Sequence, residues 1–237
     1  MLAKLDTNSD EPIAKRVFRE LRNAIVSMRF RPGRALSEQE IARQLGVSRQ
    51  PVREAFIKLS EAGLVTVRPQ RGTFVVKISV KQVFDVRFVR EAVELAVVRR
   101  ACEALSAESL DEIHANMAAQ RAAAEARDNE RFLELDEAFH RAIALGAGCE
   151  RAWRVVEEAK AQMDRVRYLS LPNATPIERL IEQHQEVVDG IIAHDAERAE
   201  SAMRLHLREI LSSLPELERR FPDLFEHDGP GTSSAAA

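Results

Sequence analysis

The spacing of apolar residues in the first third of the chain is helical and later changes to that of strands. Apolar residues recur every four positions from residue 13 to residue 25, which predicts a first helix ending near residues 31–33. Ser37 and Glu40 form a capping box ahead of a second helix, and Gly46 ends it. The apolar positions of the first helix are Ile13, Val17, Leu21 and Ile25.

A third helix is predicted from Ser48, its N-cap, to about Gly63. Residues 64–67 and 73–76 then read as strands, joined by a basic turn at 68–72. Two helices joined by a short Gly-containing turn, followed by a hairpin with a basic tip, predict a winged helix-turn-helix. The buried face of the third helix consists of Val52, Ala55, Phe56 and Leu59.

The N-terminal end of such a third helix meets base edges in the major groove. Arginine can bind guanine through two hydrogen bonds, and glutamine can pair with adenine. At the hairpin tip, Arg71 can contact a phosphate, and Gly72 lets the backbone approach the sugar-phosphate chain. A single exposed arginine is more often only solvated, but this whole arrangement favours DNA binding. The candidate residues at the helix end are Ser48, Arg49, Gln50 and Arg53.

From residue 80 to about residue 220 the apolar spacing is helical almost throughout. The expected fold class is mainly α: a winged helix-turn-helix over residues 1–77 and an antiparallel all-α bundle over residues 78–221. Residues 222–237, rich in Gly, Pro and Ser, are expected to be disordered. The candidate helices of the bundle are 80–105, 108–127, 129–146, 150–170, 176–193 and 195–219.

Charge separates the same two parts of the chain. Residues 1–77 carry 15 Lys/Arg against 8 Asp/Glu, a net charge of +7, and residues 78–237 carry 20 against 30, a net charge of −10. A basic N-terminal part is typical of a nucleic-acid module. With two cysteines and no long apolar run, we expect a cytoplasmic protein without a disulfide framework, signal peptide or membrane span.

Three histidines and one aspartate of the bundle form a candidate metal site. Asp136 and His140 are four residues apart on one helix and share a face. His184 and His206 each lie about 16 Å along their helices from the turn at 194–195, so an antiparallel hairpin brings them level. Three imidazoles and a carboxylate suit a first-row divalent ion, although each histidine could instead pair locally. The histidines expected at the surface are His114, His194 and His227.

Arg90 lies in an apolar stripe of the first bundle helix, so its guanidinium is expected to point inward. A buried arginine needs a partner, and two interpretations stay open. Glu94, one turn later, would make a structural ion pair. Alternatively, Arg90 would hold the carboxylate of a ligand whose other end binds the metal.

The N-terminal motifs resemble those of a known family. S-R-Q-P-V-R-E-A at residues 48–55 and R-G-T-F-V at residues 71–75 resemble the GntR family of bacterial regulators. The resemblance implies base contacts from Arg49 and Arg53, with Ser48 and Gln50 nearby and Gly72 at the wing. Many members carry a basic residue where this chain has Gln39. Arg43, one turn further, is expected to contribute phosphate affinity instead.

The bundle resembles the FCD ligand-binding domain of the FadR subfamily. The matching segments are D-E-A-F-H-R-A-I at 136–143, His184, and M-R-L-H-L at 203–207. In metal-binding members an aspartate and three histidines at these positions hold the ion, and the subfamily's R-x-x-x-E pattern matches Arg90 and Glu94. Such domains commonly recognise small organic acids. The residues carried over as metal ligands are Asp136, His140, His184 and His206.

One departure from the subfamily concerns the effector. Members often place an asparagine at the start of the helix after the D-x-x-x-H motif, whereas this chain has Gly-Ala-Gly-Cys at residues 146–149. Arg165 and Arg167 are candidates to supply the missing polar contact.

Together these observations predict a dimeric, ligand-responsive transcriptional regulator, and a repressor rather than an activator. It would bind a palindromic operator, a small carboxylate effector and a divalent ion, zinc before nickel or manganese. One alternative is a metal-dependent hydrolase or isomerase with a DNA-binding-like head, but the chain has no H-E-x-x-H motif and no evident base beside the ligands. We therefore expect no enzymatic activity. Another alternative is a purely structural metal ion.

Overall fold

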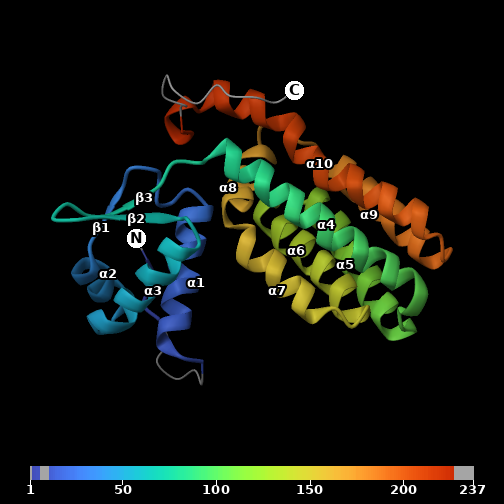
Figure 1. The fold of residues 1–237 in the computed structure, drawn as a ribbon, viewed down its shortest axis with the longest axis horizontal. Coiled ribbons are helices and arrows are strands. Elements are labelled where there is room, and N and C mark those ends of the chain that lie inside the picture. The colour runs from blue at the N-terminus through green and yellow to red at the C-terminus, as the bar shows by residue number, and fades with distance from the viewer. Residues whose placement is uncertain (1, 6–10, 227–237) are drawn as a thin grey trace. The chain divides into compact units, whose positions relative to one another are not determined.

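The structure, a computed structural model, describes residues 2–5 and 11–226, which form two compact units (Figure 1). The first unit contains the residues up to Lys81 together with those from Glu218 onward, and the second is Gln82–Leu217. Each unit has its own buried apolar core. The predicted fold class, mainly α with a small sheet beside the N-terminal helices and a C-terminal helical bundle, is confirmed.

The first unit begins with three helices, α1 (Ile13–Val26), α2 (Glu38–Leu45) and α3 (Arg49–Glu61). Helix α1 ends several residues earlier than predicted because Met28 adopts a left-handed φ of 58°. The N–H of Phe30 then bonds back to the carbonyl of Ala24 at 2.7 Å. The apolar side chains buried on the predicted faces of α1 and α3 include Val17, Leu21, Val52, Phe56 and Leu59.

Both caps of α2 follow the prediction, whereas the N-cap of α3 differs from it. Ser37 Oγ accepts a hydrogen bond from the Glu40 N–H, and Gly46 ends α2 with a φ of 72°. Ser48 occupies the N-cap position of α3, but its hydroxyl makes no capping hydrogen bond. Its role as a cap is therefore limited to its extended backbone.

A three-stranded antiparallel sheet completes the wing, with strand order β1-β3-β2. The strands are β1 (Ala35–Leu36), β2 (Val65–Arg68) and β3 (Gly72–Val75). The sequence analysis missed β1, because two residues are too few to show alternation. Arg68 pairs with Gly72 at the hairpin tip, one residue beyond the predicted end of the first strand.

The second unit contains the antiparallel helices of the bundle. The predicted helix at 150–170 is in fact two helices that separate at Lys160, whose ψ is −1°. No Gly or Pro marks this break. The buried Lys160 ammonium donates hydrogen bonds to Glu137 and Asp164, both at 2.8 Å. The helices are α4 (Val80–Ala104), α5 (Ala107–Glu125), α6 (Asn129–Gly146), α7 (Glu150–Ala159), α8 (Ala161–Ser170), α9 (Ile177–Ile192) and α10 (Ala196–Arg220).

Helices α9 and α10 approach each other closely and lie side by side in Figure 1. A Cβ added at Gly190 would lie 2.7 Å from the backbone nitrogen of Ala199. Only glycine therefore permits this spacing, and the contact sets the register of the hairpin. His184 and His206 lie six and seven residues from these two positions, on the sides away from the turn, so they are brought level.

The segment after α10 corrects one prediction. Residues 222–226, expected to be disordered, contain the turn η1 (Pro222–Leu224), and Phe225 pairs with Ile78. Two backbone hydrogen bonds of 2.9 and 2.8 Å support this pairing. Leu224 and Phe225 are both buried, and burial of these apolar side chains orders the segment. Residues 227–237 lie outside the described residues.

Candidate metal centre and nucleic-acid interface

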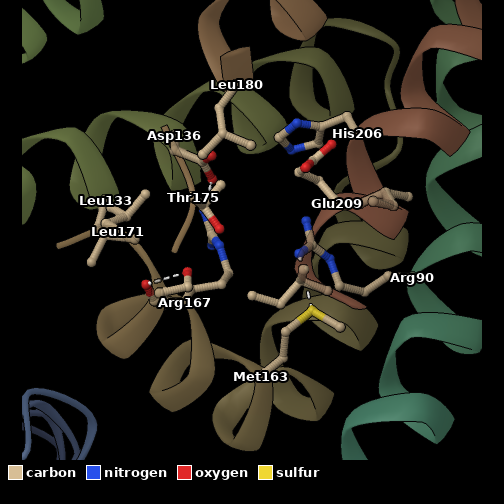
Figure 2. Close-up of a pocket in the computed structure, with 13 residues that line it drawn as sticks. Arg90, Leu133, Asp136, Met163, Arg167, Leu171, Thr175, Leu180, His206 and Glu209 are labelled. Carbon is tan, nitrogen blue, oxygen red and sulfur yellow. Dashed lines mark hydrogen bonds and ion pairs between the residues drawn. The ribbon is translucent and has the colours of Figure 1, made fainter. Parts of the chain in front are cut away.

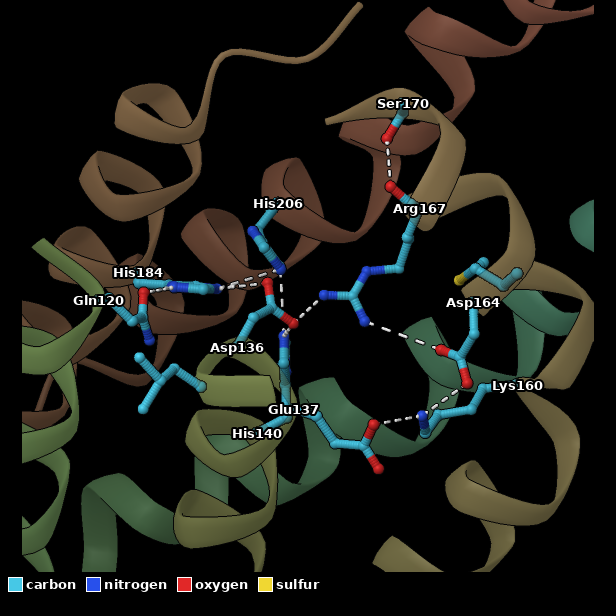
Figure 3. A network of polar contacts seen from close by, with 12 residues as sticks. Gln120, Asp136, Glu137, His140, Lys160, Asp164, Arg167, Ser170, His184 and His206 are labelled. Atoms are coloured by element: carbon cyan, nitrogen blue, oxygen red, sulfur yellow. Dashed lines mark hydrogen bonds and ion pairs between the residues drawn. The ribbon is translucent and has the colours of Figure 1, made fainter. Parts of the chain in front are cut away.

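Four side chains from three helices meet inside the bundle (Figure 3). Helix α6 supplies Asp136 and His140, α9 supplies His184, and α10 supplies His206. Each residue offers one ligand atom, and these atoms all lie within 4.8 Å of one another. All four residues are buried, and the structure thus brings together the set that the sequence analysis selected.

The distances between the ligand atoms fit a first-row divalent ion. His206 Nε2 lies 3.1 Å from His140 Nε2 and 3.3 Å from His184 Nε2. Two nitrogens held about 2.1 Å from one ion, at angles of about 90–110°, lie about 3.0–3.4 Å apart. The buried Asp136 Oδ1 accepts no hydrogen bond from the described residues and lies 3.6 Å from His184 Nε2. A cation is the partner that this arrangement of acceptors suits.

Two outer residues orient the imidazoles. Glu94 Oε2 lies 2.6 Å from His140 Nδ1, and Gln120 Oε1 lies 2.8 Å from His184 Nδ1. An acceptor at Nδ1 favours the tautomer whose Nε2 lone pair points to the shared centre. The structure therefore gives Glu94 a role beside His140 that the sequence analysis did not foresee, and it adds Gln120 to the site.

The protonation states suit metal binding. Burial lowers the pKa of His184 to about 3. Burial and the neighbouring imidazoles also lower the pKa of His206 well below its ordinary value. Burial alone would raise the pKa of Asp136, but the guanidinium of Arg167 outweighs it and holds that pKa well below its usual range. Near pH 7 His184 and His206 thus offer neutral imidazoles and Asp136 a carboxylate, the forms that bind metal ions.

A cavity of about 30 Å³ adjoins this centre (Figure 2). Asp136 and His206 belong both to the candidate metal ligands and to the cavity wall. Arg90 and Arg167 bring two guanidinium groups to the wall, and Glu209 brings a carboxylate. The remaining lining residues are Leu133, Met163, Ser170, Leu171, Thr175, Leu180, Leu207 and Ile210.

Arg90 forms an ion pair with Glu94 and also lines the cavity, so its position is compatible with both interpretations. Its Nε donates a hydrogen bond to Glu94 Oε1 at 2.6 Å, so the structural ion pair is present. Arg90 also lines the cavity, where its Nη1 lies 3.4 Å from Met163 Sδ. Burial would raise the pKa of Glu94, but Arg90 and His140 lower it to about 2. The ion pair therefore leaves Arg90 positioned at the cavity wall.

The two candidate arginines of α8 differ in position. Arg167 lines the cavity and forms an ion pair with Asp136. Arg165 is fully buried, donates a hydrogen bond to Gln162 at 3.1 Å, and is not a lining residue of the cavity. Its expected contact with an effector is therefore not supported by its position. Residues two apart on a helix point in different directions, which separates this pair.

The expected surface histidines fall into two groups. His114 is exposed, and so is most of His194, whose Nδ1 lies 2.6 Å from the carbonyl oxygen of Cys102. His227 lies outside the described residues.

Cys102 is buried and Cys149 is half-buried, and both thiols are free. Within residues 2–5 and 11–226, no helix is both long and apolar enough to cross a membrane.

The candidate DNA-contacting residues are exposed on the first unit. Arg49 and Arg53, on the first turns of α3, both form ion pairs with Glu38 of α2, at 3.0 and 3.2 Å. The pKa of Glu38 is lowered, chiefly by its hydrogen bond with Arg53, so Glu38 stays ionised. Gln50 donates a hydrogen bond to Glu54 at 3.0 Å. Sequence reasoning did not identify Glu38 as a partner of these arginines.

The remaining DNA candidates lie at α2 and the wing. Arg43 is exposed near the end of α2. Arg71 and Gly72 are exposed at the hairpin tip, where the Arg71 N–H bonds to the Arg68 carbonyl at 3.0 Å. Gly72 has a φ of 101°, and a Cβ there would meet no atom within 4 Å. Position 72 therefore requires glycine because of its positive φ, and not because a Cβ would clash with other atoms of the chain.

Comparisons with known proteins agree with both units. The model of "Bacterial regulatory proteins, gntR family" matches residues 13–75, and that of the "FCD domain" matches residues 85–209. The HTH-type transcriptional repressor RspR of Escherichia coli (strain K12) is 40% identical over 228 residues, 96% of this chain and 100% of the relative. A probable D-xylose utilization operon transcriptional repressor of Paenarthrobacter nicotinovorans is 31% identical over 179 residues, 74% of this chain and 76% of the relative. The solved structure of E. coli McbR/YncC has a TM-score of 0.75 at 22% identity, covers 89% of this chain and 99% of its own, and shows a shared fold.

Proposed function

The chain belongs to the gntR family of bacterial regulatory proteins and contains an FCD domain, and we propose that it is a repressor controlled by a small organic acid bound beside a divalent metal ion. It is a DNA-binding transcriptional regulator, as are its relatives, which are not enzymes. The hypothesis of a hydrolase or isomerase is therefore set aside. As a regulator of chromosomal operators, it would act at the bacterial nucleoid in the cytoplasm.

One observation carries the proposal: two of the four candidate metal ligands and an inward-facing arginine share one cavity wall. Asp136 and His206 line the cavity, and so does Arg90. A metal ion bound there would supply a Lewis acid for a ligand oxygen. Arg90 would hold a carboxylate oxygen of the same ligand, because guanidinium and carboxylate groups match in geometry and charge. This arrangement favours a small organic acid over an apolar effector.

The metal site would be formed by Asp136, His140, His184 and His206. Zinc suits a set of three imidazoles and one carboxylate, and nickel or manganese would also accept it. Glu94 and Gln120 would orient two of the imidazoles, as outer partners of metal-binding histidines do. A chelator should therefore reverse the response of the protein to its effector.

Operator recognition would depend on the N-terminal end of α3. Arg49, Gln50 and Arg53 are exposed there and would read bases, with Ser48 beside them. Arg43, with Arg71 and Gly72 at the wing, would contact the backbone of double-stranded DNA. Two such heads in a homodimer would match a palindromic operator.

An exposed stripe on α4 supports a homodimer. Phe84 and Phe88 are 45% and 69% exposed, and Ala92 and Ala96 continue the stripe at the same spacing of four. If a second copy packs its α4 antiparallel across a two-fold axis, Phe88 faces Ala92 of the partner and Phe84 faces Ala96. Each large ring then meets a small residue, which is the self-complementary arrangement that a two-fold interface requires. We propose this stripe as the dimer contact of the bundle.

The test is a thermal-shift screen of the zinc-loaded protein against small carboxylates, with fluorescence anisotropy on an operator selected from random duplex DNA. An effector that binds the native state raises the melting temperature with its concentration. Arg90→Ala should abolish the shift, whereas Arg99→Ala should not. Arg99 also pairs with a glutamate on α10 but does not line the cavity. Equal shifts in both variants, or no effect of any bound acid on operator affinity, would contradict the proposal.

A further inference from the structure

The C-terminal end of the described chain belongs to the DNA-binding unit and not to the bundle. Residues from Glu218 onward lie in the first unit, whereas the rest of α10 lies in the second. The chain therefore passes between the units twice, once in α4 and once in α10. We infer that residues 221–226, here called the C-terminal strap, couple metal binding in the bundle to the linker, residues 76–79 between β3 and α4. This inference rests on the proposed function and concerns the regulation of the same site.

The strap pairs with the linker through backbone hydrogen bonds. The Ile78 N–H donates to the Leu224 carbonyl at 2.9 Å, and the Glu226 N–H donates to the Ile78 carbonyl at 2.8 Å. Ile78 and Phe225 thus form a parallel bridge. Their side chains are both buried, and so is that of Leu224. A displacement of the strap must therefore either move the linker or break these bonds.

A second contact joins α4 and α10 within the bundle. Glu91 of α4 accepts hydrogen bonds from Arg208 at 2.7 Å and from Arg204 at 2.6 Å, both of α10. The Glu91 carboxylate is buried, and all three residues belong to the second unit. The two connecting segments are thus fixed to each other on both sides of the unit boundary, at Glu91 and at Ile78. The linker therefore depends on the position of α10 as well as on that of α4.

Helix α10 also carries a proposed metal ligand. His206 Nε2 lies 3.1 Å from His140 Nε2, and His206 Nδ1 has no hydrogen-bond partner among the described residues. No hydrogen bond from Nδ1 therefore fixes the ring. A bond from Nε2 to an ion would fix it, and with it the position of α10 beside α6 and α9. Metal binding would stabilise only those arrangements of α10 that allow this bond.

The part of α10 between His206 and the strap contains a weak point. Pro215 lies inside the helix and has no N–H, so one carbonyl of the preceding turn lacks its helical donor. Ser212 and Ser213 donate hydroxyl hydrogen bonds to backbone carbonyls three residues earlier, at 2.7 and 2.9 Å. Both features let a helix bend. The end of α10 can therefore change direction while the part that carries His206 stays in the bundle.

The strap is held by few bonds. Among the described residues it pairs with the linker at one bridge, and Asp223 and Glu226 are exposed. By contrast, β2 and β3 pair at four positions. Segments with few protected backbone hydrogen bonds open at a small cost in free energy. A modest effect of the metal on α10 is therefore enough to change how often the strap is open.

The experiment is hydrogen–deuterium exchange of the full-length chain, detected by NMR, with and without zinc. The informative amides are those of Ile78 and Glu226, which become exposed when the strap opens. Zinc should slow the exchange of both by about 5-fold or more, the lower range of coupling between two sites. The Val76 amide, which bonds to the Leu64 carbonyl in the same unit, should not change. Operator affinity, measured by fluorescence anisotropy, should change with zinc by a similar factor.

Two substitutions open the strap in different ways. Phe225→Ala removes the buried ring, and Glu226→Pro removes one N–H donor at a position whose preceding residue is already extended. Each should reduce the zinc effect on operator affinity to less than about 2-fold. Phe221→Ala makes the same change at a half-buried ring outside the bridge and should keep the full effect. Zinc content should be equal in all three variants, and melting curves check that each is folded.

The outcomes distinguish this inference from the proposed function. If zinc binds but leaves the exchange of Ile78 and Glu226 unchanged, the proposed function stands and the strap inference is overturned. An undiminished zinc effect on operator affinity in both Phe225→Ala and Glu226→Pro also overturns it. So does zinc that slows exchange without changing operator affinity, because the strap would then transmit nothing to DNA binding. If the protein binds no zinc, both proposals fail.

Discussion

Arg53 and Glu38 form a two-point ion pair between α3 and α2: Arg53 Nε lies 3.2 Å from Glu38 Oε1, and its Nη2 lies 3.2 Å from Oε2. Arg49 shares the same carboxylate at 3.0 Å. The two arginines proposed to read bases are therefore held and partly neutralised by one residue of the adjacent helix. A positioning carboxylate of this kind should improve discrimination between operator and other DNA.

Glu38→Gln should raise affinity for random DNA several-fold and lower the ratio of operator to random affinity. The substitution removes a negative charge from the DNA-binding face. It also releases two guanidinium groups, which can then contact phosphates of any DNA sequence. Fluorescence anisotropy at two salt concentrations measures both affinities. Glu40→Gln changes the same charge on the same helix, at a residue bonded to Gln44, and serves as the control. Equal behaviour of the two variants would show that Glu38 has no positioning role.

His140→Ala should greatly reduce zinc content, whereas His114→Ala should leave it unchanged. His140 is buried among the proposed ligands, and His114 is exposed on α5. Glu94→Gln should weaken zinc binding by about 10–100-fold, because the outer carboxylate orients the imidazole. Plasma mass spectrometry after dialysis measures the metal, and DNA binding by the metal-free protein should persist in all three. Full zinc retention in His140→Ala would rule out this site.

Glu91 should stabilise the bundle at neutral pH and lose this effect in acid. Its carboxylate bonds to Arg208 and Arg204 of α10, and these interactions lower its pKa to about 2. Since the folded pKa lies below the unfolded value of 4.5, the stabilisation is complete above about pH 4.5 and declines as the pH falls toward 2. Both arginines are partly exposed, so we expect about 1–2 kcal/mol.

Urea unfolding of Glu91→Gln at several pH values measures this contribution. The variant should be less stable than the natural chain at pH 7, and the difference should shrink between pH 4.5 and pH 3. Glu103→Gln, an exposed position near the end of α4, should have little effect at any pH. A difference that is independent of pH would mean that the carboxylate charge is not the stabilising feature.

Phe88→Asp should dissociate the proposed dimer. Phe88 is 69% exposed in the single chain and lies in the middle of the α4 stripe, so a charge there would be buried against the partner. Sedimentation velocity should show a monomer at concentrations where the natural chain is a dimer. Val155→Asp, on the 48% exposed Val155 of α7, introduces the same charge outside the stripe and should remain dimeric. A dimeric Phe88→Asp variant would place the interface elsewhere.

Local periodicity determined most of the helices and the wing hairpin from the sequence alone. The four-residue spacing of apolar positions in α1 and the capping by Ser37 require no knowledge of distant residues. The level placement of His184 and His206 also followed from helix rise and the position of one turn. These features are encoded within single elements or across one short turn.

Features that depend on partners distant in sequence were decided only by the tertiary structure. The break at Lys160 carries no Gly or Pro signal and coincides with hydrogen bonds to Glu137 and Asp164. Phe225 looked like part of a polar tail, but its burial orders residues 222–226. The two residues of strand β1 form a strand because they pair with β3. In each case the stabilising contact lies outside the local pattern.

The same distinction applies to the candidate sites. Sequence spacing selected Asp136, His140, His184 and His206, because helix geometry relates them in pairs. It could not separate Arg167, which lines the cavity, from Arg165, which does not. It also missed Gln120, Thr175 and Glu209, single polar residues on otherwise ordinary helices and loops. Their importance arises from the side chains packed opposite them, since a cavity wall is assembled from separate segments whose contacts no local periodicity encodes.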